Sequence, residues 1–391
     1  KPRKGVLAAG ILLALAPLIG FKYLGFLTKS VLSVLAHLGV QIAPPAFDFL
    51  LPMGISFYTL QAVGYLVDTY RGEKAEHNLL DFALFVGFFP QMVSGPISRG
   101  NRLLPQLSAA KRPAFDDLRD GVLLLIWGYF LKIVVADRAA LFVAAVYAPE
   151  SEYEGWFYIV ATLLFCLQLY GDFGGCSVMA MGTAKILGID LIDNFNAPYF
   201  SQSIAEFWRR WHISLSTWFR DYLYIPLGGN RKGAARQMLN MFLVWAATGI
   251  WHGANWNFIV WGLYYFVLLV IEKNFLLKFL KKCPLAAHIY TLFFVVLGWG
   301  IFTANQPGAP LGLLLNKLFV PQGGISPVYY LRNYGVFLML GCVCSSVLPR
   351  WLWERISRNT AVKAVVSALL ALLCIAYVVA ATNTTALYAN F

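Results

Sequence analysis

The sequence predicts an all-α, polytopic membrane protein, and two observations support this fold class. First, 59% of the 391 residues are hydrophobic and only 13% are charged, which leaves too little polar surface for a water-soluble globule. Second, apolar runs recur at close to the roughly 20 residues that a helix needs to cross the hydrocarbon layer of a bilayer. These runs cover residues 5–24, 119–146, 155–171, 238–251, 254–272, 284–303, 333–348 and 364–382.

Charged residues predict how the runs are oriented. The formal net charge is +12, but the cations separate the apolar runs and do not gather on one polar module. We therefore expect no nucleic-acid partner and apply the positive-inside rule. The basic segments, placed in the cytoplasm, are 99–119, 207–237, 273–282 and 349–363; the segments placed outside are 147–156, 304–331 and 383–391. Successive loops then alternate between the two sides of the membrane, provided that segments 155–206 and 238–272 each enter the membrane and return to the side from which they started.

We expect a single membrane domain over residues 1–391, because no long linker, internal repeat or polar module divides the chain. The sequence begins at Lys1 and not at Met, and we expect N-terminal spans to be missing. The six cysteines lie mostly in or beside apolar runs and form no CxxC pair and no cluster with histidine. They are interpreted as buried apolar residues, and no metal site is predicted.

Two apolar stretches, 89–96 and 168–175, are interrupted by Gly, Pro and polar residues at the expected depth of the bilayer. Irregular backbone in a bilayer must be shielded by protein or line a wet cavity, because lipid offers no hydrogen-bond partners. We therefore expect broken or re-entrant helices that enclose a space.

Residues 203–222 are predicted to form one amphipathic helix at the cytoplasmic membrane interface. Ser203 and Glu206 form the S-x-x-E pattern of a capping box. Apolar and aromatic residues then recur at three- and four-residue spacing, with Arg209 and Arg210 on the other faces. Such a stripe places its aromatic residues at headgroup depth. His212 lies at the edge of the stripe, in a position to point into the protein.

The strongest candidate for chemistry is His252, in the nearly continuous apolar region 238–271. An ionisable group at such depth is costly and by default marks a functional site. Trp251 and three other tryptophans surround it in sequence, and Asn255 is close by. Desolvation favours the neutral imidazole, which accepts a proton from an attacking hydroxyl. The alternative is a structural histidine bonded to a carbonyl at a helix break.

Two further features are weaker candidates. Asp172 follows a long apolar run, and it either orients a histidine, pairs with an arginine of 207–237 or forms a structural ion pair. The glycine-rich, basic string 226–233 either cradles a phosphorylated cofactor or is a positive-inside turn; its candidates are Asn230, Arg231 and Lys232. The sequence contains no Gly-x-Ser-x-Gly elbow, so a histidine-based transfer from an activated donor fits best.

These stretches resemble the membrane-bound O-acyltransferase (MBOAT) family, and within it the alginate O-acetyltransferase branch. The similar motifs are 54–58, 89–96, 172–175, 193–199, 206–218, 220–224, 227–231 and 251–255. The resemblance implies an MBOAT-like multi-helix bundle around a central tunnel, with a funnel from each face meeting near the middle of the bilayer. It also implies that His252 matches the catalytic histidine of the family and His212 its second characteristic histidine.

We therefore expect an O-acetyltransferase of the bacterial cytoplasmic membrane. It would move acetyl from a cytoplasmic thioester, acetyl-CoA, toward an extracytoplasmic polysaccharide or cell-wall acceptor, with no tightly bound cofactor. His252 would be the general base or an acyl relay, and His212 would line the cytoplasmic mouth and help to hold the donor. The further candidates for the donor site or the tunnel are Asp172, Arg209, Arg210, Asn230, Arg231, Lys232, Trp251 and Asn255. The expected partner is an extracytoplasmic acetyltransferase or polysaccharide-modifying protein.

Two alternatives remain open. A D-alanyl transferase for teichoic acid modification would share the fold and take its acyl group from a carrier protein. A proton-coupled transporter that uses His252 and Asp172 belongs to another class; paired inverted repeats would support it, and none is visible in the sequence.

Overall fold

The computed structural model describes residues 3–43, 45, 52–109, 111–148, 153, 155–303 and 327–380. Over these residues the chain is helical and contains no strand, which confirms the predicted fold class. Five helices are long and apolar enough to cross a membrane, namely 4–37, 157–186, 256–280, 284–303 and 360–380. A sixth candidate is a pair of helices, 334–344 and 348–356, bent by 76°. The predicted outer segment 383–391 and most of 304–331 lie outside the described residues.

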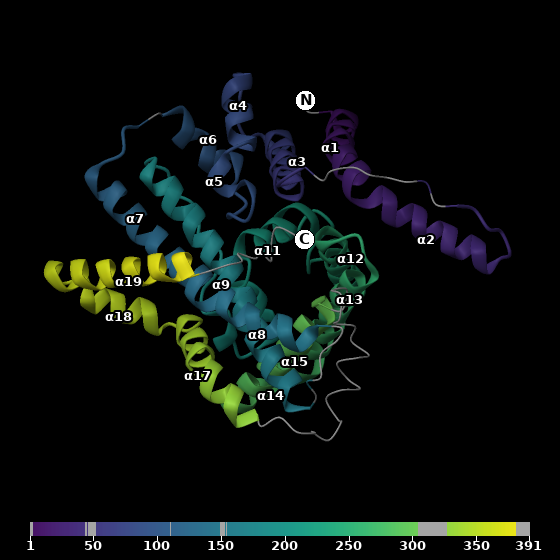
Figure 1. Cartoon of the computed structure of the whole chain (residues 1–391). Coiled ribbons are helices and arrows are strands. Elements are labelled where there is room, and N and C mark those ends of the chain that lie inside the picture. Colours follow the sequence, from purple (N-terminus) through teal and green to yellow (C-terminus); the bar gives the residue numbers. More distant parts are fainter. Residues whose placement is uncertain are drawn as a thin grey trace.

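Figure 1 labels the helices in their order along the chain. The first part of the chain contains α1 (Lys4–Leu18), η1 (Ile19–Tyr23), α2 (Leu24–His37), α3 (Ile55–Arg71), α4 (Leu79–Val86), α5 (Phe89–Met92), α6 (Gly100–Ser108), α7 (Phe115–Tyr129), η2 (Phe130–Ala136), α8 (Asp137–Tyr147) and α9 (Trp156–Ile186). The second part contains η3 (Pro198–Phe200), α10 (Ile204–Arg210), α11 (Ile213–Phe219), η4 (Arg220–Tyr224), α12 (Ala234–His252), α13 (Trp256–Ile271), η5 (Glu272–Leu276), α14 (Leu277–Leu280), α15 (Pro284–Thr303), α17 (Pro327–Cys344), α18 (Leu348–Ile356) and α19 (Thr360–Ala380).

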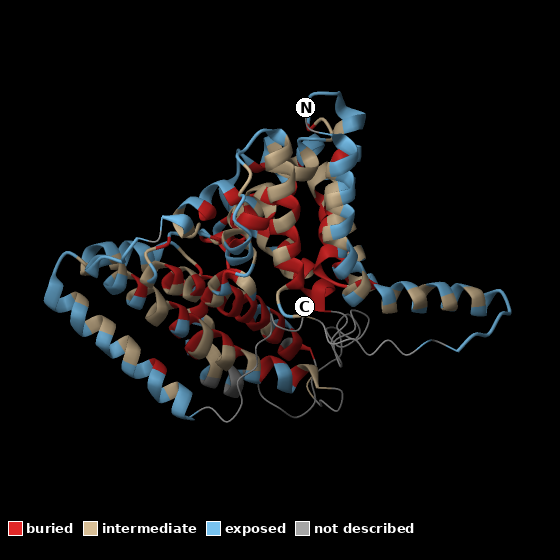
Figure 2. Ribbon diagram, turned by 90° about the horizontal axis from the view of Figure 1, so that it is seen from above, coloured by how far each residue is buried: buried red, intermediate tan, exposed pale blue. Residues whose placement is uncertain are grey.

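The core of the bundle lies around α9, which packs against α7, α8 and α15, while α13 packs against α12 and α15. Buried residues gather in this interior, whereas the peripheral helices expose most of their side chains (Figure 2). The N-terminal helix, 4–37, and α19 each bury only 6% of their most apolar stretch. Both are apolar and open to their surroundings, as expected of helices that face lipid.

The predicted break at 168–175 is wrong, because α9 runs without interruption through these residues. Its glycines instead allow α7 to approach closely. A Cβ on Gly175 would lie 2.8 Å from the carbonyl oxygen of Gly128, and one on Gly182 would lie 2.7 Å from that of Gly121. Small residues at helix interfaces are typical of membrane bundles. The predicted break at 89–96 is confirmed, because α5 ends at Met92 and the chain stays non-helical up to α6.

The single amphipathic helix predicted for 203–222 is also wrong. Its start is confirmed, because the hydroxyl of Ser203 accepts a hydrogen bond from the backbone N–H of Glu206 at 3.0 Å. The helix then stops at Arg210, and α11 begins at Ile213. The apolar residues of both pieces are buried within the protein, so the stripe packs on other helices and does not lie on the surface of the protein. The break places His212 between two short helices.

Candidate active site

The backbone of His212 has a left-handed conformation, with φ 45° and ψ 56°. This conformation costs an L-residue with a Cβ roughly 1–2 kcal/mol, so the neighbouring structure must hold it. The segment that follows α9 provides the support. The backbone N–H of Asn196 donates to the carbonyl of Arg210 at 2.9 Å, and that of Ile213 donates to the carbonyl of Asn194 at 3.0 Å. The turn at His212 is therefore fixed from both sides by residues 194–196.

The side chain of Asn194 completes this support. Its Oδ1 accepts hydrogen bonds from the backbone N–H of Ser214 at 3.1 Å and from the Ser214 hydroxyl at 2.9 Å. The same oxygen lies 3.2 Å from Nδ1 of His212. The backbone N–H of Ser214 can only donate, so the Asn194 atom that it contacts must be the oxygen and not the nitrogen of the amide. Because this oxygen can only accept, Nδ1 of His212 must carry the proton. Nε2 of His212 is left with its lone pair.

The imidazole of His212 is enclosed by aromatic rings. Its ring centroid lies 4.7 Å from that of Phe173, 6.5 Å from that of Phe57 and 6.1 Å from that of Trp251. Burial lowers the pKa of His212 to about 3, so the ring is neutral near pH 7. Among the described residues, Nε2 has no hydrogen-bond partner. The structure thus presents an uncharged, buried histidine whose Nε2 lone pair is unpaired within the part of the chain that the structure describes.

His252 is the last residue of α12 and is also buried. Its ring lies edge-on to three aromatic rings, with centroids 4.9 Å from Trp251, 4.9 Å from Trp261 and 5.4 Å from Phe302. The contacts observed for the imidazole are thus with aromatic rings, and the choice between a catalytic and a structural histidine stays a prediction. The indole of Trp251 contacts both imidazoles. The predicted pair, His212 and His252, therefore meets in one aromatic enclosure.

Close packing of α12 on α13 brings His252 into this position. A Cβ at Gly249 or Gly253 would overlap Phe258 of α13, so glycine is required at both positions. Asn255 begins α13 as its N-cap, with its Oδ1 accepting from the backbone N–H of Asn257 at 3.4 Å. Asn255 is thus placed by the structure at the turn that follows His252.

Asp172 does not join the histidines. Its Oδ1 lies 2.5 Å from Nζ of Lys132, which also donates to Asp137 at 2.6 Å. Of the three predicted arrangements for Asp172, the structure shows an ion pair, and its partner is Lys132. The physical reason is the continuity of α9, which turns Asp172 toward α7 and η2 and away from the 207–237 segment.

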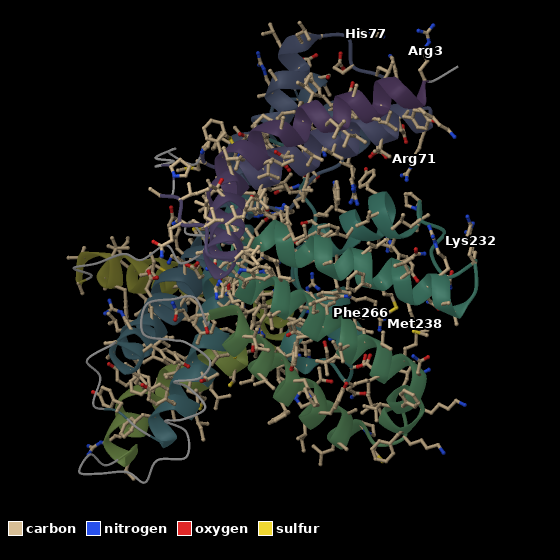
Figure 3. All side chains as sticks on the ribbon, turned by 90° about the vertical axis from the view of Figure 1, so that its right-hand side faces the viewer. Arg3, Arg71, His77, Lys232, Met238 and Phe266 are labelled. Atoms are coloured by element: carbon tan, nitrogen blue, oxygen red, sulfur yellow. The ribbon has the colours of Figure 1, made fainter. Side chains whose placement is uncertain are left out.

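The predicted phosphate-binding cations also lie away from His252. Asn230, Arg231 and Lys232 are exposed in the turn before α12, and this 19-residue helix separates them from His252 by about 28 Å. Figure 3 shows Lys232 at the outer end of this helix. On α10, Arg209 is exposed and Arg210 pairs with Glu206 at 2.6 Å.

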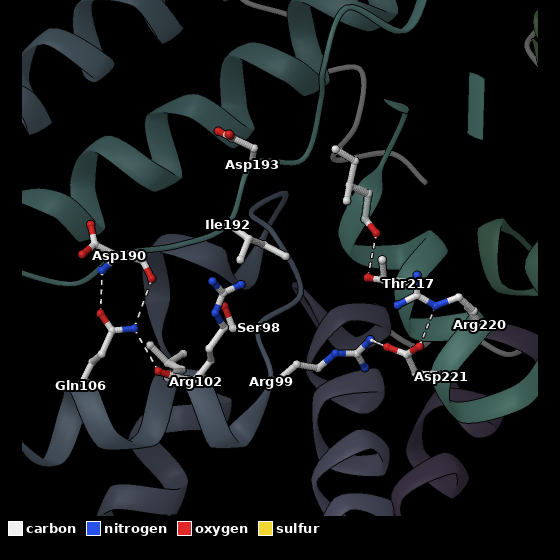
Figure 4. A pocket seen from close by; sticks show the side chains of 12 residues that line it. Ser98, Arg99, Arg102, Gln106, Asp190, Ile192, Asp193, Thr217, Arg220 and Asp221 are labelled. Carbon is white, nitrogen blue, oxygen red and sulfur yellow. Dashed lines mark hydrogen bonds and ion pairs between the residues drawn. The ribbon is translucent and has the colours of Figure 1, made fainter. Parts of the chain in front are cut away.

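A pocket of about 320 Å³ lies beside α11 instead. Its polar lining consists of three arginines and three aspartates with a few neutral groups (Figure 4): Arg99, Arg102, Arg220, Asp190, Asp193 and Asp221. Arg99 and Arg220 both bind the Asp221 carboxylate, at 3.2 and 2.7 Å. Ile213, the residue after His212, forms part of the wall. His212 itself is buried, so it lies behind the wall of this pocket and not at an open mouth.

Sequence reasoning missed two residues that hold the His212 segment. Asn194 lies in the 193–199 motif, but its contact with His212 depends on the break that the sequence did not reveal. Glu272 lies at the end of α13, and its carboxylate accepts hydrogen bonds from the backbone N–H groups of Ile204 at 2.6 Å and Ala205 at 3.1 Å. A carboxylate in an apolar run is a signal that could have identified Glu272.

With this geometry established, comparison with known proteins identifies the class. Residues 55–306 match the membrane-bound O-acyltransferase family, and the chain belongs to this family. It is 40% identical over 304 residues to the probable alginate O-acetylase AlgI of Pseudomonas aeruginosa. The aligned region covers 77% of this chain and 58% of that protein. The chain is also 34% identical over 323 residues to the peptidoglycan O-acetyltransferase of Helicobacter pylori. This aligned region covers 74% of this chain and 60% of that protein.

A third relative, the teichoic acid D-alanyltransferase of Bacillus subtilis, is 30% identical over 320 residues, covering 73% of this chain and 78% of that protein. The chain spans about 60% of the length of the alginate relatives that it matches. The family and the apolar helices together establish a multi-pass membrane protein.

Proposed function

We propose that this chain catalyses O-acetyl transfer from a cytoplasmic thioester to a hydroxyl of an extracytoplasmic polysaccharide or cell-wall polymer, in the bacterial cytoplasmic membrane. The observation that carries the proposal is the meeting of two buried histidines on the indole of Trp251. The names of the relatives, an alginate O-acetylase and a peptidoglycan O-acetyltransferase, support the reaction class. The relatives are named as O-acetylases, an O-acetyltransferase and D-alanyltransferases, so acyl transfer is preferred to proton-coupled transport.

His252 acts as the general base. The acceptor hydroxyl gives its proton to the imidazole while its oxygen forms a new C–O bond to the acetyl carbonyl. The C–S bond of the thioester then breaks, and the proton passes from His252 to the departing thiolate. Thioester cleavage supplies the driving force, so the protein needs only to position the reactants and move one proton.

The donor approaches His212 from the pocket beside α11. The three arginines of the pocket come from 99–119 and 207–237, two segments that the positive-inside rule places in the cytoplasm. Arginine binds phosphate oxygens through paired N–H donors, which suits the phosphates of acetyl-CoA. The pantetheine arm of such a donor carries amide N–H groups. Once the arm has passed the wall at Ile213, Nε2 of His212 accepts a hydrogen bond from one of them. An extracytoplasmic partner protein presents the polymer hydroxyl to His252 from the other face of the membrane.

Radiolabelled acetyl-CoA, supplied to proteoliposomes with an alginate oligosaccharide as acceptor, tests this function. We expect His252→Ala to lower transfer at least 100-fold, the typical contribution of a general base. His37→Ala is the matched control, because His37 is exposed and distant in sequence, and it should transfer at the wild-type rate. Undiminished transfer by His252→Ala would overturn the mechanism.

Two further readouts separate the alternatives. Label that stays on the protein after a rapid denaturing quench at neutral pH, and is released by acid, would replace the general base by an acyl relay on histidine. Transfer from a D-alanyl carrier protein, without transfer from acetyl-CoA, would replace the donor and assign the chain to the group of the Bacillus subtilis relative.

A further inference from the structure

The last turn of α12, which carries His252, ends without the usual helix cap. The last carbonyl groups of any helix lack intrahelical partners, and an unpaired carbonyl in an apolar environment costs several kcal/mol. After His252 the chain continues through Gly253 in an extended conformation, with φ −175°. The carbonyls of Ile250, Trp251 and His252 therefore need donors from elsewhere.

Two adjacent residues of the N-terminal helix supply these donors. Nζ of Lys22 donates to the carbonyl of Trp251 at 2.9 Å and to that of His252 at 3.2 Å. The hydroxyl of Tyr23 donates to the carbonyl of Ile250 at 2.7 Å. All three carbonyls of the last turn are thus bonded to a pair of neighbouring side chains.

The Lys22 ammonium is fully used by these contacts. An ammonium group has three N–H donors, and its third partner is the hydroxyl of Ser56 at 3.1 Å. A lysine in an apolar run is expensive unless it is paired, and here its partners include the negative end of the α12 dipole. Lys22 and Tyr23 lie in η1, a π-helical turn within the helix 4–37. Such turns occur frequently at functional sites.

We propose that Lys22 and Tyr23 are positioning residues that hold the last turn of α12 and thereby aim the imidazole of His252. The proposal rests on the proposed function, because it gives His252 the proton transfer. We call the contacts of Lys22 and Tyr23 with the last turn of α12 the clamp. Both residues lie outside 55–306, the region that matches the family, so the clamp is supplied by a helix that precedes this region. A displacement of about 1 Å at a catalytic group is enough to lower turnover 100-fold.

Three substitutions separate the parts of the clamp. Lys22→Met removes the ammonium and retains the length of the side chain, Lys22→Arg retains a cation with several donors, and Tyr23→Phe removes a single hydroxyl. Lys29→Met is the matched control, because Lys29 lies two turns further along the same helix and is exposed. The first readout is acetyl transfer in proteoliposomes, with kcat and the KM for acetyl-CoA measured separately.

We expect Lys22→Met to lower kcat by about 10- to 100-fold with the donor KM changed less than about threefold, because an aiming defect affects the transition state and not donor binding. Tyr23→Phe should lower kcat by about three- to tenfold, the value of one hydrogen bond. Lys22→Arg should restore at least half of the loss, and Lys29→Met should match the wild type. Equal kcat for Lys22→Met and wild type would overturn the proposal, as would a loss expressed in KM alone.

The second readout is independent of acetyl transfer. Hydrogen–deuterium exchange of a peptide that covers residues 245–256 should be at least tenfold faster in Lys22→Met than in the wild type, because the last turn of α12 opens more often. Unchanged exchange would overturn the clamp. If the wild type itself transfers no acetyl, the proposed function fails, while the exchange result still decides whether Lys22 holds this turn. If Lys22→Met does not fold, exchange in Tyr23→Phe decides whether the Lys22–Tyr23 pair holds this turn, and unchanged exchange there would overturn the proposal.

Discussion

The side-chain oxygen of Asn194 determines which nitrogen of His212 carries the proton. This oxygen already accepts two hydrogen bonds from Ser214, so it faces Nδ1 of His212 at 3.2 Å as an acceptor. The ring therefore donates from Nδ1 and presents an unprotonated Nε2. One amide thus fixes the tautomer, the ring orientation and the left-handed turn of the same residue.

Asn194→Ala should reduce both stability and donor use. The substitution removes an acceptor shared by three donors and leaves them unpaired in a buried site, which we expect to cost about 2–4 kcal/mol in the free energy of unfolding. Thermal unfolding of the purified protein in detergent measures the first effect, and the KM for acetyl-CoA measures the second. Asn196→Ala is the control, because Asn196 is exposed. Equal melting temperatures for the two variants would contradict this assignment.

His212 should make the folded state sensitive to acid. Burial lowers its pKa from 6.5 to about 3, so below pH 6.5 the unfolded chain binds a proton at this residue that the folded chain does not. Stability contributed by the neutral ring is complete above pH 6.5 and decreases progressively toward pH 3. The melting temperature of the wild type should therefore decrease more steeply between pH 7 and pH 4 than that of His212→Gln, which cannot titrate. Parallel slopes would show that His212 is not the buried neutral group described here.

The glycines of α9 should differ sharply in their tolerance of alanine. A Cβ on Gly175 would lie 2.8 Å from the carbonyl oxygen of Gly128, so Gly175→Ala must separate α7 from α9, and we expect a loss of about 1–3 kcal/mol. A Cβ on Gly174 would meet its nearest neighbour at 3.8 Å, an ordinary contact. Gly174→Ala should therefore be neutral or stabilising by up to about 1 kcal/mol, as for other helical glycines. Thermal unfolding distinguishes the two, and equal losses would contradict the close approach of α7.

The pocket beside α11 should determine affinity for the donor. Arg102 is exposed in this pocket and forms no ion pair with the part of the chain that the structure describes, so it is available to a phosphate. Arg102→Ala should raise the KM for acetyl-CoA about tenfold, the value of one charge-assisted hydrogen bond. Arg231→Ala, at the far end of α12, should leave the KM unchanged. If Arg231→Ala raises the KM for acetyl-CoA and Arg102→Ala does not, the donor phosphates bind at the glycine-rich turn 226–233 and not in the pocket.

The sequence predicted the fold class and His252 through one physical principle, the cost of polar groups in apolar surroundings. The same principle applied to the run 5–24 would have identified Lys22, and applied to the end of α13 it would have identified Glu272. Both residues were accessible to sequence reasoning, because the signal was local.

Other features were not accessible. A cluster of glycines fits a broken helix and a close helix contact equally well, and only the position of α7 distinguishes them at Gly175. The periodic stripe of 203–222 continues through the break because α10 and α11 both turn their apolar residues inward. For the same reason the role of Asn194 could not be predicted, since its contact with His212 exists only once the helix has ended at Arg210.

The left-handed backbone of His212 also restricts how this position can change during evolution. Most other residues would pay the same free-energy cost for the left-handed conformation and would not provide the function of the imidazole. Glycine and asparagine adopt this conformation readily. We expect that descendants which lose the histidine but retain the break will carry Gly or Asn at this position. A lineage with a β-branched residue there would have had to rebuild the turn itself.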